Sequence, residues 1–175
     1  MDIFTEQLVK RPASGKTTAL KALIGVGAAI VCLISVYLML LGFAIALFII
    51  LGACYGAFFL MSNLDVEYEY IVTNGEIDID KIIAQRTRKR LLTAKASSFE
   101  RFGKLADAPA IESGVTTIQA EGTSANSSEA YYADLPHPAF GNVRLIFSPE
   151  EKVIESLRPY FSRNLRVEYD RKYGN

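Results

Sequence analysis

The sequence has no tryptophan, a single histidine and only two cysteines among its 175 residues. Two cysteines exclude a disulfide-rich secreted scaffold, and one histidine leaves no cluster of imidazoles for a zinc site. The most informative absence is local. Residues 22–64 contain no Lys, Arg, Asp or Glu, although the chain has 19 basic and 19 acidic side chains elsewhere. An uncharged run of this length excludes a wholly soluble domain and a disordered tail, and it is typical of membrane-spanning segments.

The uncharged run is too long for one membrane helix and suits two. Its 43 residues would form a single helix about 64 Å long, roughly twice the hydrocarbon thickness of a bilayer. We therefore predict a helical hairpin with spans at about 23–41 and 43–61 and a turn at Gly42, because glycine tolerates turn dihedrals. A cleaved signal peptide is excluded because its apolar region has only about 7–15 residues.

Positive charges indicate the orientation of this hairpin. Four basic residues precede the first span: Lys10, Arg11, Lys16 and Lys21. The positive-inside rule therefore places residues 1–21 in the cytoplasm. Two spans return residues 65–175 to the same side. The sequence thus predicts a plasma-membrane protein with two spans and cytoplasmic N- and C-termini, whose first partner is the lipid bilayer.

Small residues on both predicted helices favour close packing. Gly52 and Gly56 form a G-x-x-x-G pair on the second helix, at the depth of Ala28 and Cys32 on the first. We predict that these four residues pack within the hairpin, with dimerisation as the alternative and the oligomeric state left open. Neither span contains an Asp, Glu, Lys, Arg or His, which argues against a proton relay, an ion path or a transport site.

The N-terminal segment, residues 1–21, carries part of a nucleotide-binding motif. Residues 14–18 read Ser-Gly-Lys-Thr-Thr, but the pattern G-x-x-x-x-G-K-[ST] also needs a glycine where Lys10 stands and a hydrophobic strand before it. Nucleotide binding is therefore not expected. Four apolar side chains recur at helical spacing instead: Ile3, Phe4, Leu8 and Val9. They predict a short amphipathic helix on the inner membrane surface.

Residues 65–175 are predicted to form one small β-rich domain. It opens with a hairpin in which residues 66–73 and 76–83 alternate between apolar and polar side chains around an Asn74-Gly75 turn of type I′. A third strand is expected over 86–92. Residues 98–103 read as a short turn or strand, and three more strands are expected at 115–119, 131–135 and 142–147, with a mobile loop at 121–129.

A C-terminal helix is predicted at about 149–161. Ser148 is the expected N-cap, Pro149 suits the first helical position, and Glu151 completes an S-x-x-E capping box. Pro159 should end or kink this helix. The charged tail over 162–175 is expected to be a solvated end.

A basic cluster on the predicted third strand has two readings. It comprises Arg86, Arg88, Lys89 and Arg90. In the first reading these side chains neutralise the carboxylates of the hairpin, where Glu69 lies opposite Asp80. In the second they contact anionic lipid headgroups, each surface charge contributing roughly 1 kcal/mol. A metal site at Glu76, Asp78 and Asp80 is disfavoured, because carboxylates at this spacing lie roughly 7 Å apart along a strand and no His or Asn assists them.

The sequence contains no recognisable catalytic constellation. His137 lies between two prolines, both cysteines fall in the predicted spans, and no G-x-S-x-G elbow occurs. No set of three or four ligands has the spacing of a zinc site. We therefore expect no enzymatic activity, no cofactor, no metal and no nucleic-acid partner. The outer face of the hairpin and the Tyr131–Tyr132 region are the candidate surfaces for a protein partner.

Three segments resemble a family of two-span bacterial membrane proteins of unknown function. They are Glu69–Ile83 (EYIVTNGEIDIDKII), Arg88–Leu92 (RKRLL) and Phe147–Val153 (FSPEEKV). The order of elements also resembles the bacterial pleckstrin-homology-like (PH-like) fold, in which a strongly bent, seven-stranded antiparallel sheet is closed at one end by a C-terminal helix. The resemblance implies a membrane helical hairpin plus an α+β cytoplasmic domain with a bent sheet or barrel, in a bacterial cell membrane. It implies no catalytic or binding residues.

The sequence therefore predicts an integral membrane protein that presents a small, non-catalytic binding or scaffolding domain to another protein, such as a second membrane protein. Two alternatives stay open: a sensor of anionic lipid headgroups through residues 86–90, and a membrane-bound enzyme of unrecognised type. Salt dependence separates the binding readings, because headgroup binding through four cations weakens at high ionic strength.

Overall fold

The computed structural model describes residues 4–123 and 129–174. It contains two compact units, which we describe separately. One is a helix unit of Pro12–Val66 and Ile83–Arg86. The other is a β unit, built from the residues up to Arg11, from Glu67–Ile82 and from Thr87 onward. Most of the predicted 121–129 loop, residues 124–128, lies outside the described residues.

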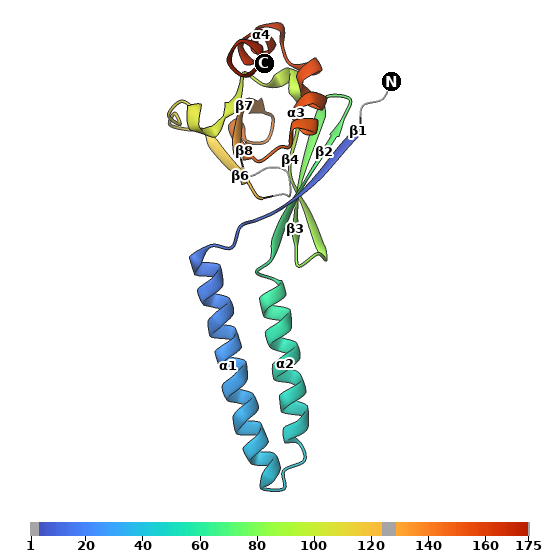
Figure 1. Cartoon of the computed structure of the whole chain (residues 1–175), viewed down its shortest axis with the longest axis vertical. Helices are drawn as coiled ribbons and strands as arrows, with labels where there is room; N and C mark the ends of the chain where they lie inside the picture. The colour runs from blue at the N-terminus through green and yellow to red at the C-terminus, as the bar shows by residue number, and fades with distance from the viewer. Residues whose placement is uncertain (1–3, 124–128, 175) are drawn as a thin grey trace. The chain divides into compact units, whose positions relative to one another are not determined.

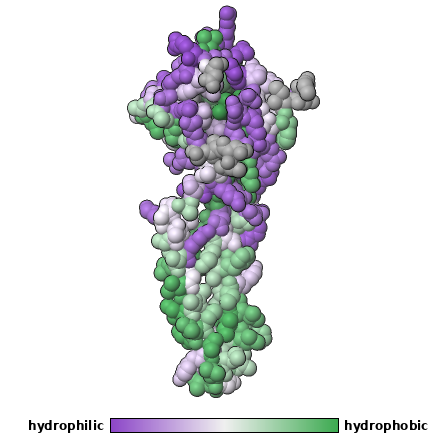
Figure 2. Space-filling model, in the orientation of Figure 1, coloured by the Kyte–Doolittle hydropathy of each residue, from purple (hydrophilic) through white to green (hydrophobic). Residues whose placement is uncertain are grey.

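The helix unit contains two antiparallel helices, α1 (Gly15–Leu40) and α2 (Ala46–Ser62), which lie side by side (Figure 1). The turn between them has Gly42 at φ +95°, as the sequence predicted. Apolar side chains cover the outside of both helices (Figure 2). By length and composition α1 is long and apolar enough to cross a membrane, whereas α2, with 17 residues, is shorter. The first helix begins at Gly15, earlier than predicted, because no helix-breaking residue lies between it and the apolar run.

The packing predicted for the four small residues is only partly correct. Ala28 and Cys32 are half-buried on α1, and the Cys32 Sγ lies 3.9 Å from the Cys54 Sγ of α2. Gly52 and Gly56, however, do not pack against α1, because a Cβ added to either glycine would meet no atom within 4 Å. The face of α2 that is turned toward α1 carries alanines at 46, 53 and 57. One residue along a helix is a rotation of about 100°, which turns Gly52 away from this seam.

The β unit contains two four-stranded sheets. The first has the order β1–β2–β3–β4 and comprises β1 (Phe4–Lys10), β2 (Val66–Thr73), β3 (Glu76–Ile83) and β4 (Thr87–Lys95). The predicted hairpin and third strand are therefore confirmed. Asn74 (φ 48°) and Gly75 (φ 81°) both have the positive φ of a type I′ turn. A Cβ at Gly75 would also lie 2.2 Å from the Tyr160 ring, so only glycine fits there.

The predicted amphipathic helix at the N-terminus is wrong. Residues 4–10 form β1, which pairs antiparallel with β2 from Phe4 opposite Thr73 to Lys10 opposite Glu67 (Figure 1). The burial of β1 follows a period of two rather than 3.6, with Gln7 and Val9 buried and Leu8 between them exposed. Both helices of the helix unit are therefore inserted between two strands that pair with each other.

A buried polar network joins β1 to the C-terminal part of the β unit. The Gln7 side chain is 3% exposed, donates to the Ser148 carbonyl (2.9 Å) and accepts from the Glu150 N–H (2.7 Å). The Tyr70 hydroxyl accepts from the Ser148 N–H (3.1 Å) and donates to the Ala120 carbonyl. Because buried polar groups need partners, this network makes β1 an integral part of the core.

The second sheet has the order β5–β7–β8–β6 and comprises β5 (Arg101–Lys104), β6 (Thr116–Ala120), β7 (Tyr131–His137) and β8 (Gly141–Phe147). The strands predicted near 115, 131 and 142 are confirmed within a few residues. Strand β6 runs parallel to β8, and the other pairs are antiparallel. The 3₁₀ turns η1 (Ala96–Ser98) and η2 (Leu105–Asp107) flank β5.

The barrel implied by the resemblance is not closed. Within the described residues, eight strands form two separate sheets, and an isolated bridge between Lys10 and Thr123 is the contact that links the edge of β1 to the segment after β6. The chain is therefore an α+β protein with an N-terminal helix pair, mainly antiparallel sheets and C-terminal helices.

The C-terminal helix is split into α3 (Glu151–Leu157), the 3₁₀ turn η3 (Arg158–Tyr160) and α4 (Arg163–Tyr173). Pro159 lies in η3, so the predicted break is confirmed. The capping box is wrong: Glu150 is the N-cap residue, and the Ser148 hydroxyl accepts from the Gly122 N–H (3.2 Å) instead. The tail is not a solvated end, because α4 buries Leu165 and packs against β5.

Candidate functional site

The basic cluster on β4 meets the carboxylates of β2 and β3. Alternation along the strand puts Arg88 and Arg90 on the same face. The Arg88 guanidinium lies 2.9 Å from Glu69, and Arg90 lies 2.5 Å from Asp78 and also contacts Asp80. This geometry agrees with the first reading of the cluster, in which its cations neutralise the acidic face of the hairpin.

Because these carboxylates are buried, their negative charge is stabilised by the neighbouring arginines rather than by water. Asp80 is 3% exposed and Glu69 is 5% exposed. Burial raises the pKa of Glu69, Arg88 opposes that increase, and Glu6 and Asp80 add to it. The hydrogen bond to Asp80 raises the pKa of Arg90, which is therefore a permanent cation. The arginines of β4 and the carboxylates of β2 and β3 neutralise each other, so Arg88 and Arg90 do not form a free cationic surface.

The other two members of the cluster have different surroundings. Arg86 belongs to the helix unit, where its guanidinium lies 4.8 Å from the centre of the Phe59 ring and 3.4 Å from the Asn63 amide oxygen. Lys89 is exposed and has no ion pair with any described residue. The four cations thus do not form one patch.

The remaining sequence candidates have structural roles. Among residues 4–123 and 129–174, no group of three His, Cys, Asp or Glu side chains is arranged to hold a metal ion. His137 lies at the β7–β8 turn, where its Nδ1 accepts from the Ala139 N–H (3.1 Å) and its ring stacks on Phe140. Tyr131 and Tyr132 are each 8% exposed, so they present little of their own surface to a partner. They alternate across β7 and pack on both of its faces.

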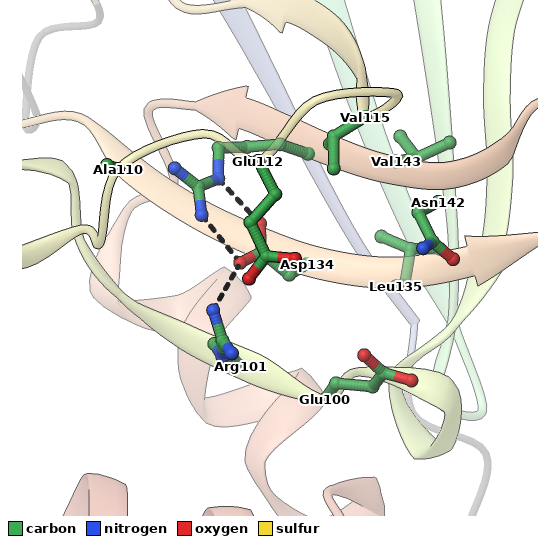
Figure 3. A pocket seen from close by; sticks show the side chains of 10 residues that line it. Glu100, Arg101, Ala110, Glu112, Val115, Asp134, Leu135, Asn142 and Val143 are labelled. Carbon is green, nitrogen blue, oxygen red and sulfur yellow. Dashed lines mark hydrogen bonds and ion pairs between the residues drawn. The ribbon is translucent and has the colours of Figure 1, made fainter.

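A cleft on the second sheet was not predicted from the sequence. Its volume is about 100 Å³. Among the residues that line it, the buried Arg144 of β8 forms a two-pronged ion pair with Asp134 of β7 (Asp134 is labelled in Figure 3), at 2.6 and 2.8 Å. Its third nitrogen donates to the Pro109 carbonyl (2.6 Å), and Arg101 approaches Asp134 at 3.9 Å. Asp134 and Arg144 are directly opposite each other in the β7–β8 pairing. Because opposite charges across a ladder attract, the correct strand register would have predicted this pair from the sequence.

The charged groups of Arg144 and Asp134 in this cleft stabilise the fold and are not free to bind a ligand. Arg144 uses all three of its nitrogens within the protein, and both Asp134 oxygens accept from it. This ion pair raises the pKa of Arg144, and the separate hydrogen bond from Arg144 to the Pro109 carbonyl ties that segment to the sheet. Glu100 and Glu112 remain at the rim as exposed groups (Figure 3).

A larger hollow of about 880 Å³ lies between α3, α4 and the adjoining ends of β5 and β7. Tyrosines, carboxylates and cations from these four elements line it. The sequence did not predict this hollow, because residues 162–175 were expected to be a solvated end. The amphipathic pattern of Leu165, Tyr169 and Tyr173, at steps of four residues, was the signal for that helix.

Comparisons with known proteins provide a family and no function. A family model described as "Bacterial PH-like domain (DUF6106)" matches residues 1–167. No curated protein and no solved structure matches the chain.

Proposed function

The chain belongs to the bacterial PH-like domain family DUF6106, and from this premise we propose that it is a two-span membrane protein whose β unit binds a protein partner without catalysis. The family predicted from three sequence segments is thereby confirmed. Its fold alone implies no ligand, so the proposal depends on the arrangement of this chain.

The observation that carries the proposal is the place of the helix pair in the chain. Lys10 at the end of β1 is opposite Glu67 at the start of β2, so the chain leaves and re-enters the β unit at neighbouring positions. If the intervening helices cross a bilayer, they must return to the side on which they started. An even number of crossings follows, and two helices are present.

The helix pair also has the chemistry of a membrane hairpin. Helix α1 is about 39 Å long at 1.5 Å per residue, and α2 is about 26 Å, so both are of the order of the hydrocarbon thickness. Charges appear where the apolar stretch ends: Lys21 pairs with Asp65 at 2.6 Å, and Arg86 contacts Phe59 of α2. With the positive-inside rule, this pattern supports cytoplasmic N- and C-termini.

A binding role suits the β unit better than an enzymatic one. On its first sheet, Arg88 and Arg90 are paired with buried carboxylates, and the His137 ring is engaged in a turn. A module of this kind acts through its surface, and its membrane anchor confines its encounters to partners at the same membrane.

Cell fractionation of the full chain tests the anchor. We expect the protein to stay in bacterial membranes after alkaline carbonate washing, and a C-terminal tag to be cleaved by protease only when the inner face is accessible. Recovery of the chain in the carbonate supernatant, or cleavage from the outside, would refute the two-span proposal.

Contact with anionic lipid is the second candidate function, and the surroundings of Arg86 favour it. This cation lies at the C-terminal end of α2 and forms no ion pair with any described residue. Lipid retention by the purified full chain can be measured by mass spectrometry at low and high salt. Loss of anionic lipid in R86A, but not in K89A, would support this candidate. Equal retention in both variants would exclude it.

A further inference from the structure

The hollow between α3 and α4 has an aromatic wall. Tyr131, Tyr169 and Tyr173 line it, and the Tyr169 ring lies 5.1 Å from Tyr173 and 5.4 Å from Phe102, measured between ring centres. Burial raises the pKa of Tyr169 to about 12 and also raises that of Tyr131. These phenols therefore stay neutral at physiological pH. The Lys172 ammonium lies 5.3 Å from the centre of the Tyr173 ring, so this aromatic wall already attracts a cation.

The cations around the hollow are already engaged. Three ion pairs hold them: Lys104 with Glu129 at 2.8 Å, Arg158 with Asp170 at 2.8 Å, and Lys172 with Asp107 at 3.1 Å. Tyr173 reinforces the last pair by donating to Asp107 (2.5 Å). An anionic ligand would thus have to compete with carboxylates for each of these cations.

Two carboxylates of the wall have no such partner. Glu151 and Glu155 lie one turn apart on α3, are exposed, and form no ion pair with any described residue. Like charges at positions i and i+4 repel each other on a helix. A cation placed between them would relieve that repulsion, and the neighbouring tyrosine faces would bind the same cation.

We propose that this hollow binds an arginine side chain displayed by the protein partner. The inference rests on the proposed function and specifies the chemistry of that partner. A planar guanidinium can donate hydrogen bonds to carboxylates at its edge while it stacks on an aromatic face, which an ammonium group does less well. A volume of about 880 Å³ has room for the arginine and for adjoining residues of an extended segment.

Peptide binding to the full chain in detergent micelles tests this site. The probe is acetyl-Gly-Arg-Gly-Arg-Gly-amide, compared with the same peptide containing citrulline, which keeps the shape of arginine and removes its charge. Isothermal titration calorimetry gives the affinity. We expect the arginine peptide to bind at least tenfold more tightly than the citrulline peptide. Equal affinity, or no binding of the arginine peptide, would overturn the proposal.

Matched variants locate the binding. Glu151→Gln/Glu155→Gln removes the two unpaired carboxylates at exposed positions, and Glu112→Gln/Glu168→Gln removes two exposed carboxylates that do not line the hollow. We expect at least a tenfold loss of affinity in the first variant and less than a twofold change in the second. Similar losses in both would indicate a general charge effect and overturn the site. Far-UV circular dichroism verifies that each variant is folded.

Photocrosslinking in cells separates failure of this inference from failure of the proposed function. With a photoreactive residue at exposed position 168, a protein partner captured by the wild-type chain but not by E151Q/E155Q supports both proposals. Equal capture by both chains refutes the hollow as the binding site and leaves the proposed function standing. Peptide binding without any captured protein refutes the partner-binding function.

Discussion

Arg90 shows how individual side chains stabilise the outer face of the first sheet. It contacts two carboxylates of β3, Asp78 and Asp80. Asp80 is almost fully buried, so its charge has lost most of its hydration and relies on the guanidinium. Because the Arg90 side chain itself is 48% exposed, solvent screens part of this attraction.

Arg90→Ala should therefore destabilise the β unit. We expect a loss of about 1–3 kcal/mol in unfolding free energy, because the buried Asp80 carboxylate would lose its cation. Urea unfolding of the full chain in detergent, followed by tyrosine near-UV circular dichroism, measures this loss. Lys89→Ala on the same strand is the control and should change stability by no more than about 0.5 kcal/mol. Equal losses in both variants would contradict the assignment.

Glu69 makes the stability of the β unit depend on pH. Burial raises its pKa above the usual 4.5, Arg88 lowers it, and Glu6 and Asp80 raise it further. The folded state then binds more protons than the unfolded chain in the window above pH 4.5, so the unfolding free energy falls as pH rises through that window. We expect Glu69→Gln to remove this part of the slope in urea unfolding from pH 4.5 to about 7. Glu168→Gln, an exposed control, should keep the slope, and a slope retained in E69Q would refute the assignment.

At the scale of elements, the seam between α1 and α2 is made of small residues. Alanines and cysteines face each other across it, while both glycines of the G-x-x-x-G pair are turned away. Small side chains let two helices approach closely, and van der Waals contact then holds them together where water is absent. The geometry of the seam can be tested without any knowledge of function.

Oxidative crosslinking should join α1 to α2 within one chain. The two sulfurs, Cys32 Sγ and Cys54 Sγ, are 3.9 Å apart, so copper phenanthroline is expected to form an intramolecular disulfide in membranes. Non-reducing peptide mass spectrometry detects it. The control is C32A/A29C, which moves the thiol to an exposed position on α1 and should not form the bond. Crosslinking between two chains through Cys54, or equal crosslinking in the control, would contradict this packing.

At the scale of the whole molecule, the β unit is assembled from segments that lie on both sides of the helix pair. Strand β1 contributes Gln7 and Val9 to the core, and Gln7 satisfies two backbone groups near α3. Chain connectivity alone would assign residues 4–10 to the membrane anchor. Pairing with β2 assigns them to the β unit.

Replacing residues 12–65 with Asn-Gly should yield a folded, water-soluble domain. The register places Lys10 opposite Glu67, so two residues between Arg11 and Val66 suit a type I′ turn. We expect dispersed amide signals in a ¹H–¹⁵N NMR spectrum. The fragment 66–175 lacks β1, leaves the Glu150 N–H and the Ser148 carbonyl without Gln7, and should aggregate or stay unfolded. If that fragment folded equally well, β1 would not be part of the core.

Several features could be predicted from sequence because local chemistry determines them. The uncharged run specifies the helix pair, since 43 residues without charge exceed one span. Asn74-Gly75 and the alternation on either side specify the β2–β3 hairpin, because the turn type sets the register. The opposition of arginines and carboxylates on β2–β4 follows from the same register.

Other features were decided only by tertiary structure, because their partners are distant in sequence. Strand β1 buries only Gln7 and Val9, which is a weak local pattern. It forms because β2 pairs with it, although the whole helix pair lies between the two strands in the sequence. Helix α4 exists because β5 and the aromatic core accept Leu165 and Tyr169. The hollow beside α4 is lined by residues from α3, α4, β5 and β7, so the pattern of α4 alone could not have revealed it. The sequence by itself determined which segments are apolar and how neighbouring strands register, and the tertiary structure decided which distant segments complete the β unit.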